Sequence, residues 1–113
     1  MAELSSLMGF DVNNQRSVED WALQHSDDHW LIRQRIQDQS LGNLPAWQLW
    51  PVNFRDWDAY ALRHQAAHNE MNDALGLSGS DLTGVDFKDE KAVKEWNLTH
   101  FSEHEAAHSS LGI

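Results

Sequence analysis

The sequence contains no cysteine, which excludes disulfides, thiolate metal sites and cysteine nucleophiles. Val, Ile and Thr are few beside Leu and Ala, so the apolar residues favour helix over strand. No apolar run reaches the roughly 18 residues that span a bilayer, and no basic and then apolar leader opens the chain. We therefore predict a soluble, unprocessed, all-α protein.

Basic residues are also scarce. Eight Lys and Arg oppose 18 Asp and Glu, which gives a formal net charge of −10. Phosphate backbones and anionic membranes repel such a chain, so we expect neither nucleic acid nor membrane among its partners. The sequence has no glycine-rich phosphate loop and no G-x-S-x-G motif. We expect no enzymatic activity and assign no catalytic residue.

The length of 113 residues fits one domain. We expect residues 1–16 to form an N-terminal arm or a short docking helix, and residues 17–113 to form a helical domain. Helices are expected over 17–40, with Ser17 and Asp20 as a capping box and Gly42 as a stop, over 53–75, and from Asp86 or Asp89 to 111. The connector 41–52 contains both prolines, and we expect it to cover an edge of the core.

Each expected helix has a narrow apolar face that also includes Trp and His. These faces consist of Val18, Trp21, His25, His29, Ile32 and Ile36; Trp57, Ala61, His64, His68, Met71 and Leu75; and Val93, Trp96, His100, His104, Ala107 and Leu111.

The histidines form a repeated pattern. All seven lie in pairs or ladders with a spacing of four residues. Residues 21–29 and 96–104 share Trp-x3-His-x3-His, and the strings HQAAH (64–68) and HEAAH (104–108) resemble each other. We interpret the chain as three degenerate repeats of about 40 residues, joined by connectors that contain Pro or Gly. In the middle copy, Trp57 precedes His64 by seven residues instead of four.

Three interpretations of the histidines stay open. In the first they are packing residues that need no cofactor, each stacked on an indole and hydrogen-bonded across the bundle. In the second they bind Zn or Fe, because imidazoles four residues apart on one helical face can share an ion. In the third they form a pH switch, since protonating all seven changes the formal charge from −10 to −3. The candidate ligands are His25, His29, His64, His68, His100, His104 and His108.

The acidic residues near the histidines favour packing over metal binding. Glu-x-x-His, which di-iron bundles use twice, occurs once, at Glu105 to His108. The acids near each His pair vary, whereas dedicated metal sites carry outer-shell carboxylates at fixed places. Pairs such as Asp27 with Asp28 and Glu103 with Glu105 are typical of a solvated helix face. HEAAH matches the zinc-protease string, but no third ligand follows it.

One resemblance covers about residues 17–113. The Trp-His-His helix, the connector SDLTGVDF, the acidic start DEKAVKEW and the ending HSSLGI look like small proteins encoded among the structural genes of tailed bacteriophages. The resemblance implies a minor virion component, attached to head, connector or tail and without enzymatic activity, whose partners are other virion proteins or copies of itself. We expect a structural or interaction protein of this kind, and the alternative is a His-rich metal-binding helical bundle.

Three tryptophans lie off the helical faces and are our candidates for partner contacts, because Trp is enriched at protein interfaces. The alternative is that they seal the helical bundle. They are Trp30, Trp47 and Trp50.

Overall fold

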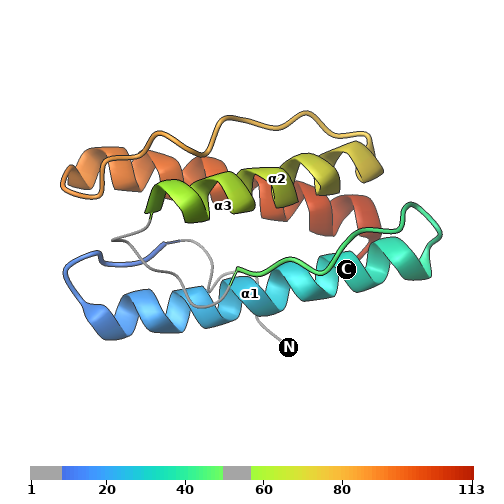
Figure 1. The fold of residues 1–113 in the computed structure, drawn as a ribbon, viewed down its shortest axis with the longest axis horizontal. Coiled ribbons are helices and arrows are strands. Elements are labelled where there is room, and N and C mark those ends of the chain that lie inside the picture. Colours follow the sequence, from blue (N-terminus) through green and yellow to red (C-terminus); the bar gives the residue numbers. More distant parts are fainter. Residues whose placement is uncertain (1–8, 50–56) are drawn as a thin grey trace.

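The computed structural model describes residues 9–49 and 57–113, and within these ranges it contains three α-helices and no strand (Figure 1). The helices are α1 (Gln15–Asp38), α2 (Trp57–Leu75) and α3 (Glu90–Leu111). The predicted all-α class is therefore confirmed. No helix in the described part of the chain is long and apolar enough to cross a membrane.

All three helices run in the same direction, and extended segments return the chain from the end of one helix toward the start of the next (Figure 1). Contacts at the C-terminal ends agree with this arrangement. The Gln39 side-chain amide, just past α1, donates to the carbonyl of Leu111 at the end of α3 at 2.9 Å. Gly42 packs beside Ala74 near the end of α2. Equivalent positions on the three helices therefore lie at the same height in the bundle.

Both ends of α1 differ from the sequence prediction. The helix is capped by Asn14, whose side chain accepts from the backbone N–H of Ser17 at 3.2 Å. Ser17, predicted as the cap, instead accepts from the N–H of Asp11 with its hydroxyl at 3.0 Å. Asn caps helices at least as well as Ser, which explains the earlier start. The helix ends before the predicted stop at Gly42, and Ser40 takes a φ of 58°. The predicted start of the second helix at residue 53 lies outside the described residues.

The start of α3 is at one of the two predicted caps. The Asp89 side chain accepts from the backbone N–H groups of Lys91 at 3.1 Å and Ala92 at 3.3 Å. We expect Asp89→Ala to lower the free energy of unfolding by about 1 kcal/mol, because two N–H groups lose their acceptor. Urea denaturation measures this loss, with Glu105→Ala as a control on an exposed position of the same helix. Equal losses in the two variants would show that the cap is not responsible.

The buried faces of the helices are largely the predicted ones, although Leu75 is only partly buried. An aromatic cluster lies toward the N-terminal ends of the helices, an aliphatic cluster lies toward the C-terminal ends, and the histidines occupy the turns between them. The return segment before α2 packs on this core through Leu49, as expected for a connector that covers a core edge, and residues 50–52 of that connector lie outside the described ranges. The aromatic cluster includes Trp21, Trp57, Tyr60 and Trp96. The aliphatic cluster consists of Ile32, Ile36, Met71, Ala107 and Leu111.

Candidate metal centre

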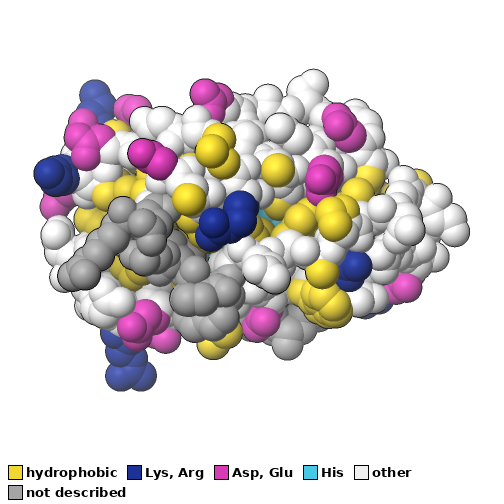
Figure 2. Space-filling model, in the orientation of Figure 1, with side chains coloured by type: hydrophobic (Ala, Val, Ile, Leu, Met, Phe, Trp, Pro, Cys, Tyr) yellow, Lys and Arg dark blue, Asp and Glu magenta, His cyan; other side chains and the backbone are white. Residues whose placement is uncertain are grey.

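Each helix contributes two histidines, four residues apart, to the middle of the bundle. Because the helices are parallel, the six side chains form two layers of three, and none is more than 2% exposed. On the face drawn in Figure 2, histidine appears only as a small area near the centre. We call these six residues the histidine cluster. Its first layer is His25, His64 and His100, and its second layer is His29, His68 and His104.

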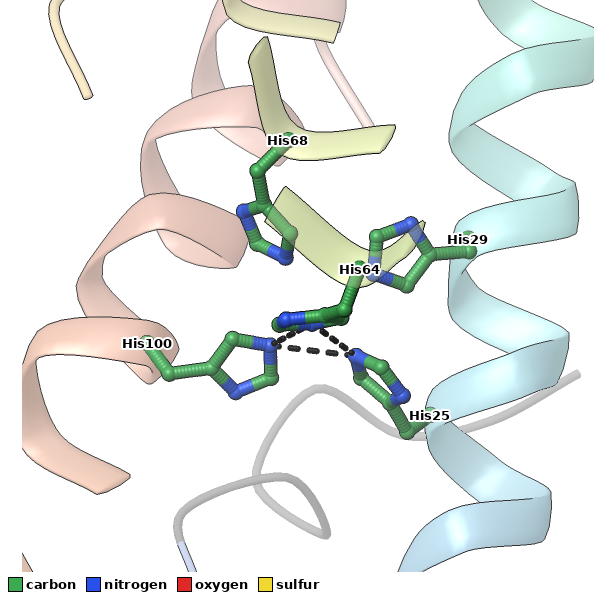
Figure 3. Close-up of side chains that lie close together, drawn as sticks. All are labelled: His25, His29, His64, His68 and His100. Atoms are coloured by element: carbon green, nitrogen blue, oxygen red, sulfur yellow. Dashed lines mark hydrogen bonds between the residues drawn. The ribbon is translucent and has the colours of Figure 1, made fainter. Parts of the chain in front are cut away.

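The first-layer side chains point at one another, one from each helix (Figure 3). The Nε2 atom of His64 lies 3.1 Å from that of His25 and 3.0 Å from that of His100. The Nε2 atoms of His25 and His100 are 3.0 Å apart. Three ring nitrogens from three helices therefore form a nearly equilateral triangle.

Hydrogen bonds alone cannot satisfy this triangle. In a neutral imidazole, each Nε2 carries either a hydrogen or a lone pair. With three nitrogens and only two states, at least two nitrogens are alike, so one edge of the triangle sets two N–H groups or two lone pairs against each other. A bound cation removes the conflict, because it accepts all three lone pairs at once.

The spacing of the nitrogens is close to that of a metal centre. Zinc–imidazole distances of about 2.0–2.1 Å place the nitrogens of a tetrahedral site about 3.3–3.4 Å apart, so the triangle needs to open by only about 0.3 Å. One ring nitrogen from each of five residues lies within 4.8 Å of all the others in the set. These five are His25, His29, His64, His68 and His100. The Nε2 atom of His104 lies at the edge of the group, 3.1 Å from that of His100.

Two buried carboxylates orient second-layer rings. The Nδ1–H of His104 donates to Asp28 at 2.6 Å, and the Nδ1–H of His68 donates to Glu103 at 3.1 Å. A hydrogen on Nδ1 leaves the lone pair on Nε2, which is the nitrogen that faces the cluster. Metal-binding histidines almost always have an outer carboxylate or carbonyl partner of this kind, which fixes the tautomer and raises the basicity of the ligand.

Both carboxylates are themselves held in place. Glu103 accepts from the side-chain amide of Asn72 at 2.9 Å and from the backbone N–H of Ser80 at 3.1 Å. The second oxygen of Asp28 accepts from Nε2 of His108 at 2.6 Å. Asp28 is 1% exposed and Glu103 is 7% exposed. Such burial of acids requires several hydrogen bonds, and both residues have them.

The solvated face predicted for these acids is therefore wrong for Asp28 and Glu103, although Asp27 and Glu105 are exposed. A sequence signal existed: each buried acid comes three residues after a first-layer histidine, in HSDDH (25–29) and HFSEH (100–104). That spacing returns the acid to the buried side of the helix. The variable acids near the His pairs do not count against a metal site, because the carboxylate partners come from neighbouring helices.

The carboxylates follow an incomplete threefold order. Asp28 of α1 reaches His104 of α3, and Glu103 of α3 reaches His68 of α2. The equivalent position of α2 is the buried Ala67, which has no carboxylate to offer to His29 of α1. Neither ring nitrogen of His29 has a hydrogen-bond partner among the described residues. The cluster therefore has two second-layer histidines that are oriented by a carboxylate and one that is not.

An aromatic ring stacks on each first-layer histidine from one turn earlier in the same helix. The ring centroids are 4.6 Å apart for Trp21 and His25 and 4.7 Å apart for Trp96 and His100. In α2 the stacking ring is Tyr60, 5.7 Å from His64. Tyr60 thus occupies the place of the tryptophan in the other helices, which accounts for the shifted register of Trp57. The three helices share the pattern aromatic-x3-His-x3-His, and their origin as an internal repeat stays a prediction.

Burial lowers the pKa of five histidines well below the ordinary value of about 6.5, and the proximity of the other imidazoles lowers it further. These rings are therefore neutral at neutral pH, which is the form that binds metal ions. The five are His25, His29, His64, His68 and His100.

Three of the remaining sequence candidates, His108, Trp30 and Trp47, lie around the cluster. His108, predicted as a ligand, is not among the five histidines whose ring nitrogens lie within 4.8 Å of one another. It instead donates from Nε2 to Asp28. Trp30 is 54% exposed, whereas Trp47 is half-buried and donates from its indole N–H to Glu70 at 2.8 Å. Trp50 lies outside the described residues. Comparisons of the chain with protein-family models, with curated proteins and with solved structures give no match.

Proposed function

We propose that this protein binds one divalent transition-metal ion inside the histidine cluster. The observation that carries the proposal is the triangle of Nε2 atoms from three helices, 3.0–3.1 Å apart, which hydrogen bonds cannot satisfy. The alternative interpretation of the sequence, a His-rich metal-binding bundle, is thus the one that the geometry favours.

The donor atoms favour some metals over others. Imidazole nitrogen suits Zn, Cu, Fe and Ni, whereas Ca²⁺ and Mg²⁺ prefer oxygen ligands. The two nearest carboxylates, those of Asp28 and Glu103, hydrogen-bond to histidines and support them from outside. Zn²⁺ or Fe²⁺ is therefore the expected ion.

Charge favours a single divalent ion. Five of the cluster histidines are neutral at neutral pH, and a buried cation needs negative charge close by. Asp28 and Glu103 supply two carboxylates that accept hydrogen bonds from the cluster residues His104 and His68. The two negative charges balance an ion of charge +2. Two ions in the same cluster would leave uncompensated buried positive charge.

The closed geometry favours a structural ion over a catalytic one. Structural sites are enclosed by protein ligands, whereas catalytic sites keep a position open to substrate. All six histidines are buried, and together they come from all three helices. An ion at this place joins the helices, so its binding energy stabilises the fold. The net charge of −10 attracts cations to the protein.

Titration of the metal-free protein with Co²⁺ tests the proposal. Co²⁺ substitutes for Zn²⁺ and reports its ligands through visible absorption bands. We expect bands that saturate at one ion per chain and disappear when Zn²⁺ is added. Absorption that stays at the level of free aqueous Co²⁺ throughout the titration would contradict the proposal.

Asp28→Asn provides a test of the outer carboxylates. The variant removes the negative charge and disturbs the tautomer of His104, so we expect metal affinity to fall about 10–100-fold. Asp27→Asn is the matched control, since it removes the same charge from the adjacent exposed position. Competition with a chelator of known affinity measures both variants. Equal affinities in the two would refute a role for Asp28.

The expected role as a minor virion component of a tailed phage stays a prediction, as does the absence of enzymatic activity. The exposed Trp30 supports a contact with another virion protein or with a second copy of the chain. A metal-stabilised bundle and a virion component are compatible functions.

A further inference from the structure

A small cavity reaches the histidine cluster at one side. It has a volume of about 50 Å³, which is several times the space needed by one water molecule. The ion needs such a path, because all six histidines of the cluster are buried. The lining residues are Ser26, His29, Trp30, Arg33, Trp47 and Leu49.

His29 is the cluster residue at this cavity, and it differs from its two counterparts in the second layer. His68 and His104 are oriented by Glu103 and Asp28, whereas His29 has no partner on either ring nitrogen among the described residues. No hydrogen bond therefore resists rotation of the His29 ring. A ligand that rotates can bind an incoming ion before the fixed ligands do.

Trp47 lines the cavity beside His29. Its ring lies edge-on to that of His29, with the centroids 5.5 Å apart. It belongs to the stretch 41–49, which has no helix or strand. Several hydrogen bonds fix this stretch against the helices, and three of them are at residues 44, 45 and 47. The Trp47 indole N–H donates to Glu70 at 2.8 Å, and Nε of Arg33 donates to the carbonyls of Leu44 at 3.0 Å and Pro45 at 2.9 Å.

We propose that the cavity between His29 and Trp47 is the port through which the metal ion reaches and leaves the cluster. Trp47 moves outward to open the port, and His29 is the first residue to bind the ion. The ion then moves to the nitrogens of the first-layer histidines. This inference rests on the proposed metal-binding function. It adds the route of the ion into the cluster and names Trp47 as the residue that limits the rate of metal uptake and release.

The test compares rates with affinities for Zn²⁺ in the full chain. A colorimetric chelator in excess measures release, and stopped-flow mixing with Zn²⁺ measures uptake. We expect Trp47→Ala to accelerate both about tenfold, because a hydrogen bond and the packing that keep the port closed are lost, while the dissociation constant stays the same. Gln48→Ala is the control, since Gln48 is the exposed neighbour of Trp47 in the same stretch and does not line the cavity. Its rates should match those of the unmodified protein.

A second variant serves if Trp47→Ala does not fold. Glu70→Ala removes only the acceptor of the Trp47 indole, and we expect it to accelerate release about fivefold. Zn²⁺ binding with unchanged rates in both variants would overturn the port and leave the proposed function intact. A protein that binds no Zn²⁺ at equilibrium would overturn both.

Discussion

Replacing His64 with Leu should abolish metal binding and yet stabilise the metal-free protein. Nε2 of His64 contacts the corresponding atoms of His25 and His100, so the substitution removes one corner of the triangle. We expect affinity to fall by more than about 100-fold, since loss of an outer-shell partner alone costs 10–100-fold. His64 is fully buried and Leu has a similar volume, so the frustrated polar contacts are replaced by apolar packing. The gain in unfolding free energy should be about 1 kcal/mol.

Denaturation of the metal-free variant and Zn²⁺ competition measure the two effects. Tyr60→Phe is the matched control: Tyr60 stacks on His64, and its buried hydroxyl has no hydrogen-bond partner among the described residues. This control should keep its metal affinity. A His64→Leu variant that is less stable without metal, and that still binds Zn²⁺ like the control, would favour the packing interpretation.

Acid should unfold the metal-free protein at mildly acidic pH. Five buried histidines have pKa values well below the ordinary value of about 6.5, because burial and neighbouring imidazoles oppose their protonation. Above pH 6.5 the rings are neutral in both states and stability does not depend on them. Below pH 6.5 the unfolded chain takes up protons that the folded chain refuses. Each histidine then lowers the unfolding free energy by about 1.4 kcal/mol per pH unit.

Circular dichroism at 222 nm with urea at a series of pH values checks this prediction. We expect the unfolding free energy to fall steeply between pH 6.5 and 5 and the helical signal to be lost soon after. His64→Leu should reduce the slope, because one titrating group is removed. Zn²⁺ should shift the transition to lower pH, since the ion competes with protons for the same nitrogens. Constant stability from pH 7 to 5 would contradict the neutral cluster and the pH-switch hypothesis alike.

The sequence predicted the parts of the fold that depend on local pattern. The periodicity of Trp21, His25 and His29 placed these residues on one buried face, and Asp89 was one of the two predicted caps of the third helix. The pattern places the end of the first helix at residue 40 with Gly42 as its stop, whereas the helix ends at Asp38 and Ser40 adopts the positive φ. Several neighbouring residues can end a helix with similar stability, so the residue at which the helix ends depends on contacts with the rest of the protein.

The candidate site depended on tertiary arrangement that the pattern did not contain. The parallel direction of the helices brings His25, His64 and His100 to one height, whereas an up-and-down bundle would separate equivalent positions. Asp28 and His104 are 76 residues apart in sequence and come from different helices. Tyr60 replaces a tryptophan in the repeated pattern, so a comparison based on Trp alone placed the middle copy out of register. Only the ring contacts in the structure show that Tyr60 stacks on its histidine as the tryptophans do in the other two helices.

The most direct test of the metal centre is the metal content of the protein, measured by mass spectrometry on untagged material purified without chelator. The triangle of first-layer nitrogens, the second-layer histidines and the two outer carboxylates predict one zinc or iron ion per chain. They also predict that His64→Leu, purified in parallel, contains none. A metal-free protein that takes up neither Zn²⁺ nor Fe²⁺ when they are offered would contradict the account and leave the histidines as packing residues.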